Sequence, residues 1–170
     1  CQNTAGYLNL SRLVSRAYRE GQSKGVAMVD RAWLDEQTVS GLIALSGAKE
    51  GDVGRALLHG REEDANAALD FWLDLFGDRY YLELQRTGRQ GEETYLNAAL
   101  HVAYARGIPV VATNDVRFIR PEDFEAHEAR VCIHDGTLLD DPKRPRRYSP
   151  QQYLKSPEQM AQLFRDVPEA

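Results

Sequence analysis

The apolar positions of the chain recur with two different periods, one typical of helices and the other of strands. Spacing of i, i+3, i+4 and i+7, which gives a helix one apolar face, occurs in several segments. These segments predict helices at 9–20, 52–59, 61–76, 92–106 and 121–134, with shorter helices beginning at Asp30 and near Ser156. In the first helix the apolar face consists of Leu10, Leu13, Val14, Ala17 and Tyr18.

Three short apolar runs lie between these helices and predict β-strands. They are 41–46, 79–85 and 109–112, the last within the segment IPVVATNDVRFI at 108–119, and the first and last are expected to be buried. Along 79–85, Tyr81 and Glu83 share one face, and Tyr80, Leu82 and Leu84 share the other. Strands that alternate with long helices are typical of βαβ units, which place the strands in parallel. Because three strands are too few to close a barrel, the sequence predicts an α/β fold whose parallel sheet forms one side of a barrel.

The composition is that of one ordinary globular domain of 170 residues, 42% hydrophobic and 28% charged. There is no signal peptide and no apolar run near the roughly 20 residues that cross a membrane. The net charge of −5 argues against a broad nucleic-acid-binding surface, so that any such contact would be local. Cys1 and Cys132 are too few for a disulfide framework, which favours a cytoplasmic protein. The first residue is not Met, which indicates a piece of a longer protein.

Polar residues follow the second and third predicted strands, where α/β folds gather ligands and catalytic groups. Glu83 lies on one strand and Asp115 just beyond the next, so both could reach the same end of the sheet. One interpretation is a metal site or an acid–base pair. The other is a pair of hydrogen-bonded carboxylates with a structural role.

The residues around these carboxylates argue against a metal site. Asp115-x-Arg117 would be a better metal motif with His in place of Arg117, since a guanidinium repels a metal cation. Thr87, at the end of the second strand, is also a poor ligand. The histidines lie on predicted helices away from the strand ends, which favours packing or surface roles. They are His59, His101, His127 and His134.

A loop rich in proline and charge, 140–150, follows the last long helix. Its charged residues are Asp140, Asp141, Lys143, Arg144, Arg146 and Arg147. The basic ones indicate a contact with nucleic acid or with an acidic partner. A solvated loop with local ion pairs is the alternative, and it is the interpretation that we favour. The chain has no Walker loop, GxGxxG motif, CxxC pair or serine nucleophile elbow.

Several long segments of the chain resemble those of a known family. They are NTAGYLNL (3–10), LSGAKEGDVGRALL (45–58), YYLELQRTGR (80–89), PVVATNDVRFI (109–119), FEAHEARVCIHDG (124–136), LDDPKRPRRYSPQQYL (139–154) and DVPEA (166–170). Over its whole length the chain is similar to the PHP (polymerase and histidinol phosphatase) domain of the alpha subunit of bacterial DNA polymerase III, of the proteobacterial replicative type.

The resemblance implies a distorted (β/α)7 TIM-like barrel, of which residues 1–170 form the C-terminal part, a single partial PHP domain. The first strands, with the family's His-x-His metal motif, would precede Cys1. The palm, thumb and fingers of the polymerase would follow Ala170 and would hold the catalytic carboxylates and Mg²⁺. The chain itself would then contain no catalytic residue and no cofactor. DNA would be bound through the full-length chain, and membranes would not be contacted.

The resemblance also implies a vestigial metal site. Metal-binding members of the family hold a cluster of metal ions with His, Asp and Glu side chains at the barrel mouth. Their pattern has His at the position of Thr87 and Asp-x-His where this chain has Asp115-x-Arg117, so only Asp115 is retained. Losing two imidazoles and gaining a guanidinium should abolish tight binding of several metal ions.

A catalytically silent domain is therefore the expectation. Its family role would be to brace the polymerase and to dock the proofreading exonuclease subunit, within an assembly that contains the other DNA polymerase III holoenzyme subunits. The alternative is an active metal-dependent phosphoesterase or proofreading domain, which would need ligands from outside this chain.

Overall fold

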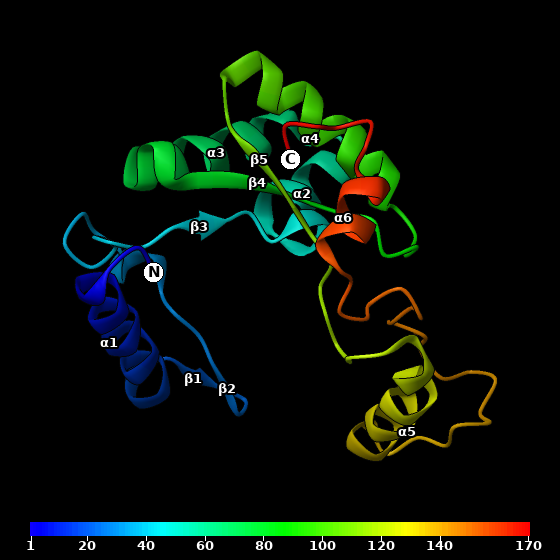
Figure 1. Ribbon diagram of the computed structural model, residues 1–170. Coiled ribbons are helices and arrows are strands. Elements are labelled where there is room, and N and C mark those ends of the chain that lie inside the picture. Colours follow the sequence, from blue (N-terminus) through cyan, green and yellow to red (C-terminus); the bar gives the residue numbers. More distant parts are fainter.

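The structure is a computed structural model that describes all of residues 1–170, with six α-helices and two small sheets (Figure 1). In chain order the elements are α1 (Thr4–Glu20), β1 (Gln22–Ser23), β2 (Val26–Ala27), β3 (Ala44–Leu45), α2 (Asp52–Leu58), α3 (Glu62–Phe76), β4 (Tyr80–Gln85), α4 (Glu92–Arg106), β5 (Val110–Thr113), α5 (Phe124–Asp135) and α6 (Pro157–Leu163). None of the helices combines the length and the apolar character that crossing a bilayer requires.

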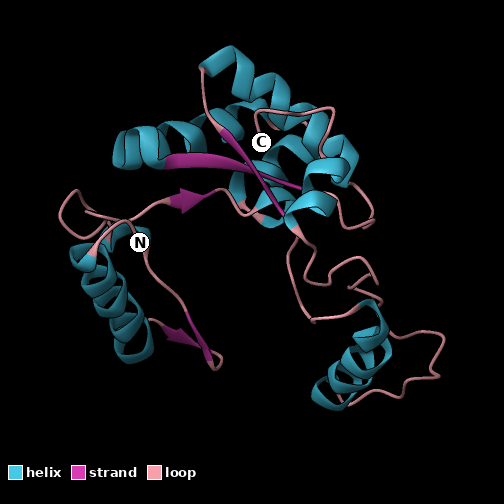
Figure 2. Cartoon of the chain, viewed as in Figure 1, coloured by secondary structure: helices cyan, strands magenta, loops and turns pink.

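The larger sheet is parallel and has the strand order β3-β4-β5. Leu82 of β4 lies opposite Val110 of β5, and Tyr80 of β4 lies opposite Ala44 of β3. Helices α2 and α3 connect β3 to β4, and α4 connects β4 to β5, as in consecutive βαβ units (Figure 2). The predicted α/β fold with a parallel sheet is confirmed. The sheet is open and does not close into a barrel.

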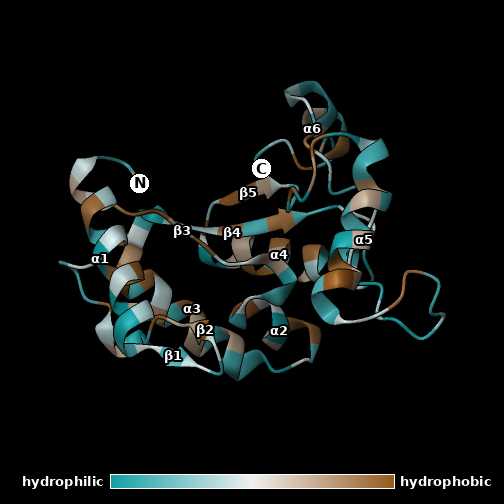
Figure 3. Cartoon of the chain, turned by 90° about the horizontal axis from the view of Figure 1, so that it is seen from below, coloured by the Kyte–Doolittle hydropathy of each residue, from teal (hydrophilic) through white to brown (hydrophobic).

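The hydrophobic core lies between β4 and the helices that connect the strands. Tyr80, Leu82 and Leu84 alternate along β4, and each is at most 1% exposed. They belong to the same cluster as Leu69 of α3 and Leu96 of α4. Figure 3 shows apolar residues along β5 and on parts of α2 and α4. Of the two faces that the sequence separates along this strand, the one with Tyr80, Leu82 and Leu84 is therefore the inner face.

The strand β3 is shorter and less buried than the sequence predicts. The expected buried strand 41–46 contributes only Ala44 and Leu45 to the sheet, and Ile43 and Leu45 are 44% and 46% exposed. The prediction of a buried strand is wrong here because β3 is an edge strand that pairs only with β4. An edge strand has backbone partners on one side alone, so its ladder is easily cut short.

The first helix also differs from its prediction. It begins at Thr4 rather than at residue 9, because Oδ1 of Asn3 accepts a hydrogen bond of 2.9 Å from the N–H of Gly6. Of its predicted apolar face only Leu13 and Ala17 are buried. The helix packs against the β1-β2 hairpin and lies apart from the central sheet, as does α5 on the opposite side of the molecule (Figure 1).

The later helices agree with the prediction to within a few residues. Helix α4 spans the predicted 92–106 and ends at Gly107, whose φ of +64° is a backbone conformation that favours glycine. Pro121 opens a 3₁₀ turn, and α5 itself starts at Phe124. Helix α6 begins at Pro157 after Ser156, which caps it by accepting a hydrogen bond from the N–H of Gln159.

The C-terminal segment is tied to the end of β4 by an ion pair between Arg86 and Asp166. The two oxygens of the Asp166 carboxylate accept hydrogen bonds of 2.6 and 2.8 Å from the guanidinium group. Arg86 also lies 2.9 Å from Glu93 of α4. The hydrogen bonds from Arg86 lower the pKa of Asp166 from 3.8 to about 2.

Asp166→Asn is expected to reduce the loss of stability in acid. Because folding lowers the pKa of Asp166, its ion pair stabilises the fold above about pH 4 and stops doing so as the pH falls through about 2. Urea unfolding at a series of pH values across this window should show a smaller decrease for the variant than for the unmodified protein. Glu169→Gln removes a neighbouring exposed carboxylate and serves as the control. If Asp166→Asn left the pH dependence of stability unchanged, the Asp166–Arg86 ion pair would not contribute to it.

Candidate functional site

Asp115 lies where the carboxyl ends of β4 and β5 approach the segment 149–152. It follows β5 with a φ of +42°, a left-handed backbone conformation that residues other than glycine seldom adopt. Its Oδ1 lies 2.8 Å from Nη2 of Arg117, and its Oδ2 lies 3.2 Å from Nη1 of Arg89. Two guanidinium groups therefore hold this carboxylate.

Gln152 fixes the same carboxylate through its amide group. Its side chain is fully buried, and Nε2 donates to Oδ2 of Asp115 at 2.8 Å and to the Asp115 carbonyl at 3.2 Å. The N–H of Arg117 donates in turn to the carbonyl of Gln152 at 2.8 Å. These contacts hold Asp115 in its strained conformation and leave its carboxylate surrounded by donors.

Thr87 belongs to the protein interior. It is fully buried, and its hydroxyl and N–H donate to the two carboxylate oxygens of Glu92 at 2.5 and 2.6 Å. Nε of Arg89 donates to the Thr87 hydroxyl at 2.9 Å and to Glu92 at 3.1 Å. The Glu92 carboxylate lies in the first turn of α4, where the helix dipole favours negative charge.

Glu83 and Asp115 lie at the same end of the sheet, joined through two intervening side chains. Glu83 accepts hydrogen bonds from the hydroxyl of Thr113 at 2.5 Å and from Nε2 of Gln85 at 3.3 Å. Oε1 of Gln85 accepts from Nη2 of Arg89 at 3.0 Å, and Arg89 reaches Asp115. The two carboxylates form part of one network of hydrogen bonds and ion pairs, which agrees with the structural interpretation of the pair.

A cavity of about 640 Å³ opens beside Asp115. Its lining carries five cationic side chains, which are Lys49, Arg89, Arg117, Arg146 and Arg147. Glu50 and Asp115 are its only acidic residues, and Tyr148 is its only hydrophobic one. The cavity is therefore a polar, positively charged pocket at the place where the sequence predicts the vestigial site.

The cations of the loop 140–150 have three different surroundings. Arg144 is internal: its Nη1 lies 2.5 Å from Glu128, and the two side chains are 8% and 5% exposed. Arg146 and Arg147 are exposed and line the cavity, and Arg147 also lies 3.0 Å from Asp135. Lys143 is exposed and lies outside the cavity lining. The four residues that the sequence groups as one contact are thus divided between interior and surface.

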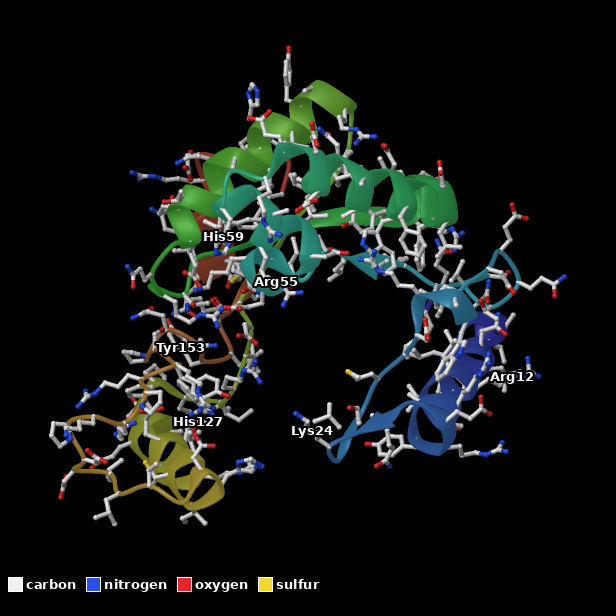
Figure 4. All side chains as sticks on the ribbon, turned by 180° about the vertical axis from the view of Figure 1, so that it is seen from behind. Arg12, Lys24, Arg55, His59, His127 and Tyr153 are labelled. Atoms are coloured by element: carbon white, nitrogen blue, oxygen red, sulfur yellow. The ribbon has the colours of Figure 1, made fainter.

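The histidines do not line this cavity. His59, His101 and His134 are exposed. His127 of α5 packs edge-on against Tyr148 with ring centroids 4.7 Å apart, and burial lowers its pKa. Figure 4 shows His59 at the end of α2 and His127 on α5, on different parts of the molecule.

Sequence reasoning identified Thr87, Asp115 and Arg117 but missed Arg89, Glu92 and Gln152. Arg89 is the group that links Thr87 to Asp115, through a hydrogen bond of 2.9 Å and an ion pair of 3.2 Å. Arg89 lies in a short turn after β4, two residues beyond Thr87, and this position could have marked it as a residue of the site. Gln152 is 37 residues from Asp115, and no local pattern connects them.

A protein-family model described as the PHP domain matches residues 1–87, slightly more than half of the chain. The chain belongs to the PHP domain family. Proteins named DNA polymerase III subunit alpha are similar to this PHP chain over 99% of its length. The Escherichia coli relative is 57% identical over 168 residues, that of Pseudomonas aeruginosa 56% over 168 and that of Vibrio cholerae 53% over 169. The chain spans 14% of the length of each of these relatives.

The metal cluster of catalytic PHP domains does not fit the side chains of this site. The Thr87 hydroxyl donates to Glu92 and is shielded from the cavity, and the Asp115 carboxylate faces two guanidinium groups. No three His, Cys, Asp or Glu side chains converge at any place in the chain. A metal ion at Asp115 would have to displace two arginine side chains and would then lie beside their positive charges.

Proposed function

We propose that this chain is the C-terminal part of the PHP domain of a replicative DNA polymerase III alpha subunit and that the domain is catalytically silent. The assignment to a polymerase is supported by the identity of 53–57% to three alpha subunits over almost the whole chain. DNA-directed DNA synthesis and its Mg²⁺ then belong to a polymerase region outside these residues, and the bacterial protein acts in the cytoplasm. DNA is bound by the whole protein.

The ion pairs of Asp115 carry the proposal of catalytic silence. A hydrolytic metal site needs carboxylate and imidazole ligands that are free to bind the ion. Here the carboxylate lies 2.8 and 3.2 Å from Arg117 and Arg89, and no imidazole lines the cavity. Arginine stays protonated in proteins, so these side chains cannot turn into ligands.

The role of the domain is to brace the polymerase and to dock a proofreading exonuclease subunit. Strand β3 pairs with β4 alone, so its other edge is free, and Leu45 and the preceding Ile43 are exposed beside it. Both features support a sheet that continues into further strands of a distorted (β/α)7 barrel. A rigid scaffold with little chemistry of its own suits a position between the polymerase and the other holoenzyme subunits.

Metal analysis and a phosphoesterase assay of the full-length protein test the proposal that the domain is catalytically silent. We expect no stoichiometric metal after gel filtration and no hydrolysis of p-nitrophenyl phosphate with added Mn²⁺ or Zn²⁺. Stoichiometric metal together with hydrolysis, both abolished by Asp115→Ala, would establish the active metal-dependent phosphoesterase instead.

Hydrogen exchange of the full-length protein tests the docking part. Adding the purified exonuclease subunit is expected to protect backbone amides within residues 1–170, because a bound partner excludes water and restrains local opening. Bovine serum albumin at the same concentration is the control. Protection confined to regions outside these residues would overturn the docking role and would leave the catalytic silence unaffected.

A further inference from the structure

We propose that one face of α1, formed by Arg12, Arg16 and Arg19, binds the sugar-phosphate backbone of duplex DNA without reading its sequence. These three side chains are called the α1 basic face below. The inference rests on the proposed polymerase function, because that function brings DNA to the protein. It concerns a surface that shares no lining residue with the cavity beside Asp115.

The first argument is the uneven distribution of charge along the chain. Residues 1–29 hold four of the 21 Lys and Arg residues but only one of the 26 Asp and Glu residues. This segment therefore carries a net charge of about +3, in a chain whose net charge is −5. A positive surface on an otherwise acidic protein attracts a polyanion to that surface alone.

The second argument is that the three arginines share one face of the helix. At 3.6 residues per turn, positions 12, 16 and 19 fall within about 60° of one another around the helix axis. All three residues are exposed, and Figure 4 shows Arg12 on the outer side of α1. The rise of about 1.5 Å per residue spreads them over about 10 Å, which is the length of about three base pairs of a duplex.

The third argument is the position of this face relative to the apolar residues of α1. Tyr7, Val14 and Tyr18 are exposed, and they lie about 150° around the helix axis from the α1 basic face. Leu13 and Ala17, which lie between the two faces, are buried. A part of the full-length protein that covers the apolar residues therefore leaves the arginines in contact with solvent.

The fourth argument is that the guanidinium groups keep unused donors. Arg19 has no ion-pair or side-chain hydrogen-bond partner in the chain, and Arg12 donates only to Oδ1 of Asn9, at 3.3 Å. Nε of Arg16 donates to Glu20 at 2.8 Å, and Glu20 is the one acid of the segment 1–29. Because a guanidinium group has five N–H donors, all three can bind phosphate oxygens and keep their contacts within the chain.

The surroundings of this face favour the backbone of a duplex over single-stranded DNA. Gln37 and Thr38 line a cavity of about 300 Å³ beside the α1 basic face, and such amide and hydroxyl groups often contact phosphate and sugar oxygens. Trp33 also lines it, but this ring is half-buried and the Arg16 guanidinium lies 4.2 Å from its centre. Unpaired bases bind by stacking on free aromatic rings, and this ring leaves them little surface.

Fluorescence anisotropy of a labelled primer–template duplex, titrated with the full-length protein at several salt concentrations, tests this inference. Arg12→Gln combined with Arg19→Gln is expected to weaken binding by about tenfold or more at about 50 mM salt. The slope of the logarithm of the association constant against the logarithm of the salt concentration should become shallower by about 2, because two phosphate contacts no longer release counterions. Arg12→Lys combined with Arg19→Lys keeps both charges and should keep the slope.

Lys24→Gln combined with Arg55→Gln is the charge-matched control. Both residues are exposed, and Figure 4 shows Lys24 on the other side of the unit of α1 and the hairpin, and Arg55 on α2. This pair should change the affinity by less than about twofold. Arg12 and Arg19 have no buried partner, so the glutamine variant should fold normally, which the thermal unfolding curve checks.

Two results would overturn the proposal and leave the proposed function intact, provided that the unmodified protein binds the duplex. They are an unchanged salt slope in the Arg12 and Arg19 glutamine variant, and an equal loss of affinity in the control pair. Unchanged DNA binding together with loss of the exonuclease subunit on gel filtration would show instead that this face binds an acidic protein. An unmodified protein that bound no duplex would contradict the polymerase function itself.

Discussion

Glu92→Ala is expected to lower the free energy of unfolding by about 3–5 kcal/mol. The Glu92 side chain is 4% exposed, and its carboxylate accepts hydrogen bonds from the N–H and hydroxyl of Thr87 and from Arg89. Without it, these donors stay in the interior with fewer partners, and the guanidinium loses its nearest counter-charge on that side. The first turn of α4 also loses a favourable charge. Equilibrium urea unfolding followed by circular dichroism measures the change.

Glu93→Ala is the matched control for this variant. Glu93 is the next residue on the same helical turn, but its side chain is 64% exposed and pairs with Arg86 at the surface. Its removal should cost no more than about 1 kcal/mol. An equally small decrease in the free energy of unfolding for both variants would show that the buried contacts of Glu92 contribute little to stability.

Arg144→Met is expected to destabilise the fold strongly, because it removes one partner of an ion pair that is largely shielded from solvent. Arg144 and Glu128 are both nearly inaccessible, with Nη1 and Oε2 2.5 Å apart, and Arg144 also donates to the carbonyl of Leu139 at 2.9 Å. Removing the guanidinium leaves the Glu128 carboxylate buried without its counter-ion. Its other oxygen already has no hydrogen-bond partner in the chain. Thermal and urea unfolding of the variant measure the loss.

A double variant distinguishes the effect of losing the charge pair from the effect of losing packed side-chain volume. Arg144→Met combined with Glu128→Leu replaces both charges by apolar groups and should recover much of the stability that the single variant loses. Lys143→Met, at the exposed neighbouring position, should change the stability by less than about 0.5 kcal/mol. A double variant less stable than Arg144→Met alone would refute the explanation by an uncompensated charge.

The sequence predicted best those elements whose local signals and tertiary surroundings agree. Helix α4 has the predicted bounds because a regular apolar pattern ends at a glycine in the left-handed conformation. The alternation along 79–85 also reappears in β4, since this strand is central and its inner face is buried. The prediction failed at 41–46, where an apolar run marks an edge strand with exposed side chains. An apolar run predicts a strand, but it does not show whether that strand has one or two neighbouring strands in the sheet.

The site shows the same division between local and long-range information. The pair Asp115 and Arg117 is two residues apart, and its charges alone argue against a metal site. By contrast, Arg144 and Arg146 have the same side chain in the same loop, yet one is an internal ion-pair partner of Glu128 and the other lines the cavity. Composition cannot separate two such residues, because burial depends on which helix the loop crosses.

The sequence by itself determined the α/β class, the order of strands and helices, and the resemblance to the PHP domain, because periodicity, capping residues and family motifs are local properties of the chain. The tertiary structure alone decided that Arg89 bridges Thr87 and Asp115 and that Gln152 holds Asp115 from 37 residues away. It also decided that cations from several separate segments meet in one pocket. The physical reason is that charge interactions act across space, so their effect is set by the folded distances and the burial of the groups rather than by their spacing in sequence.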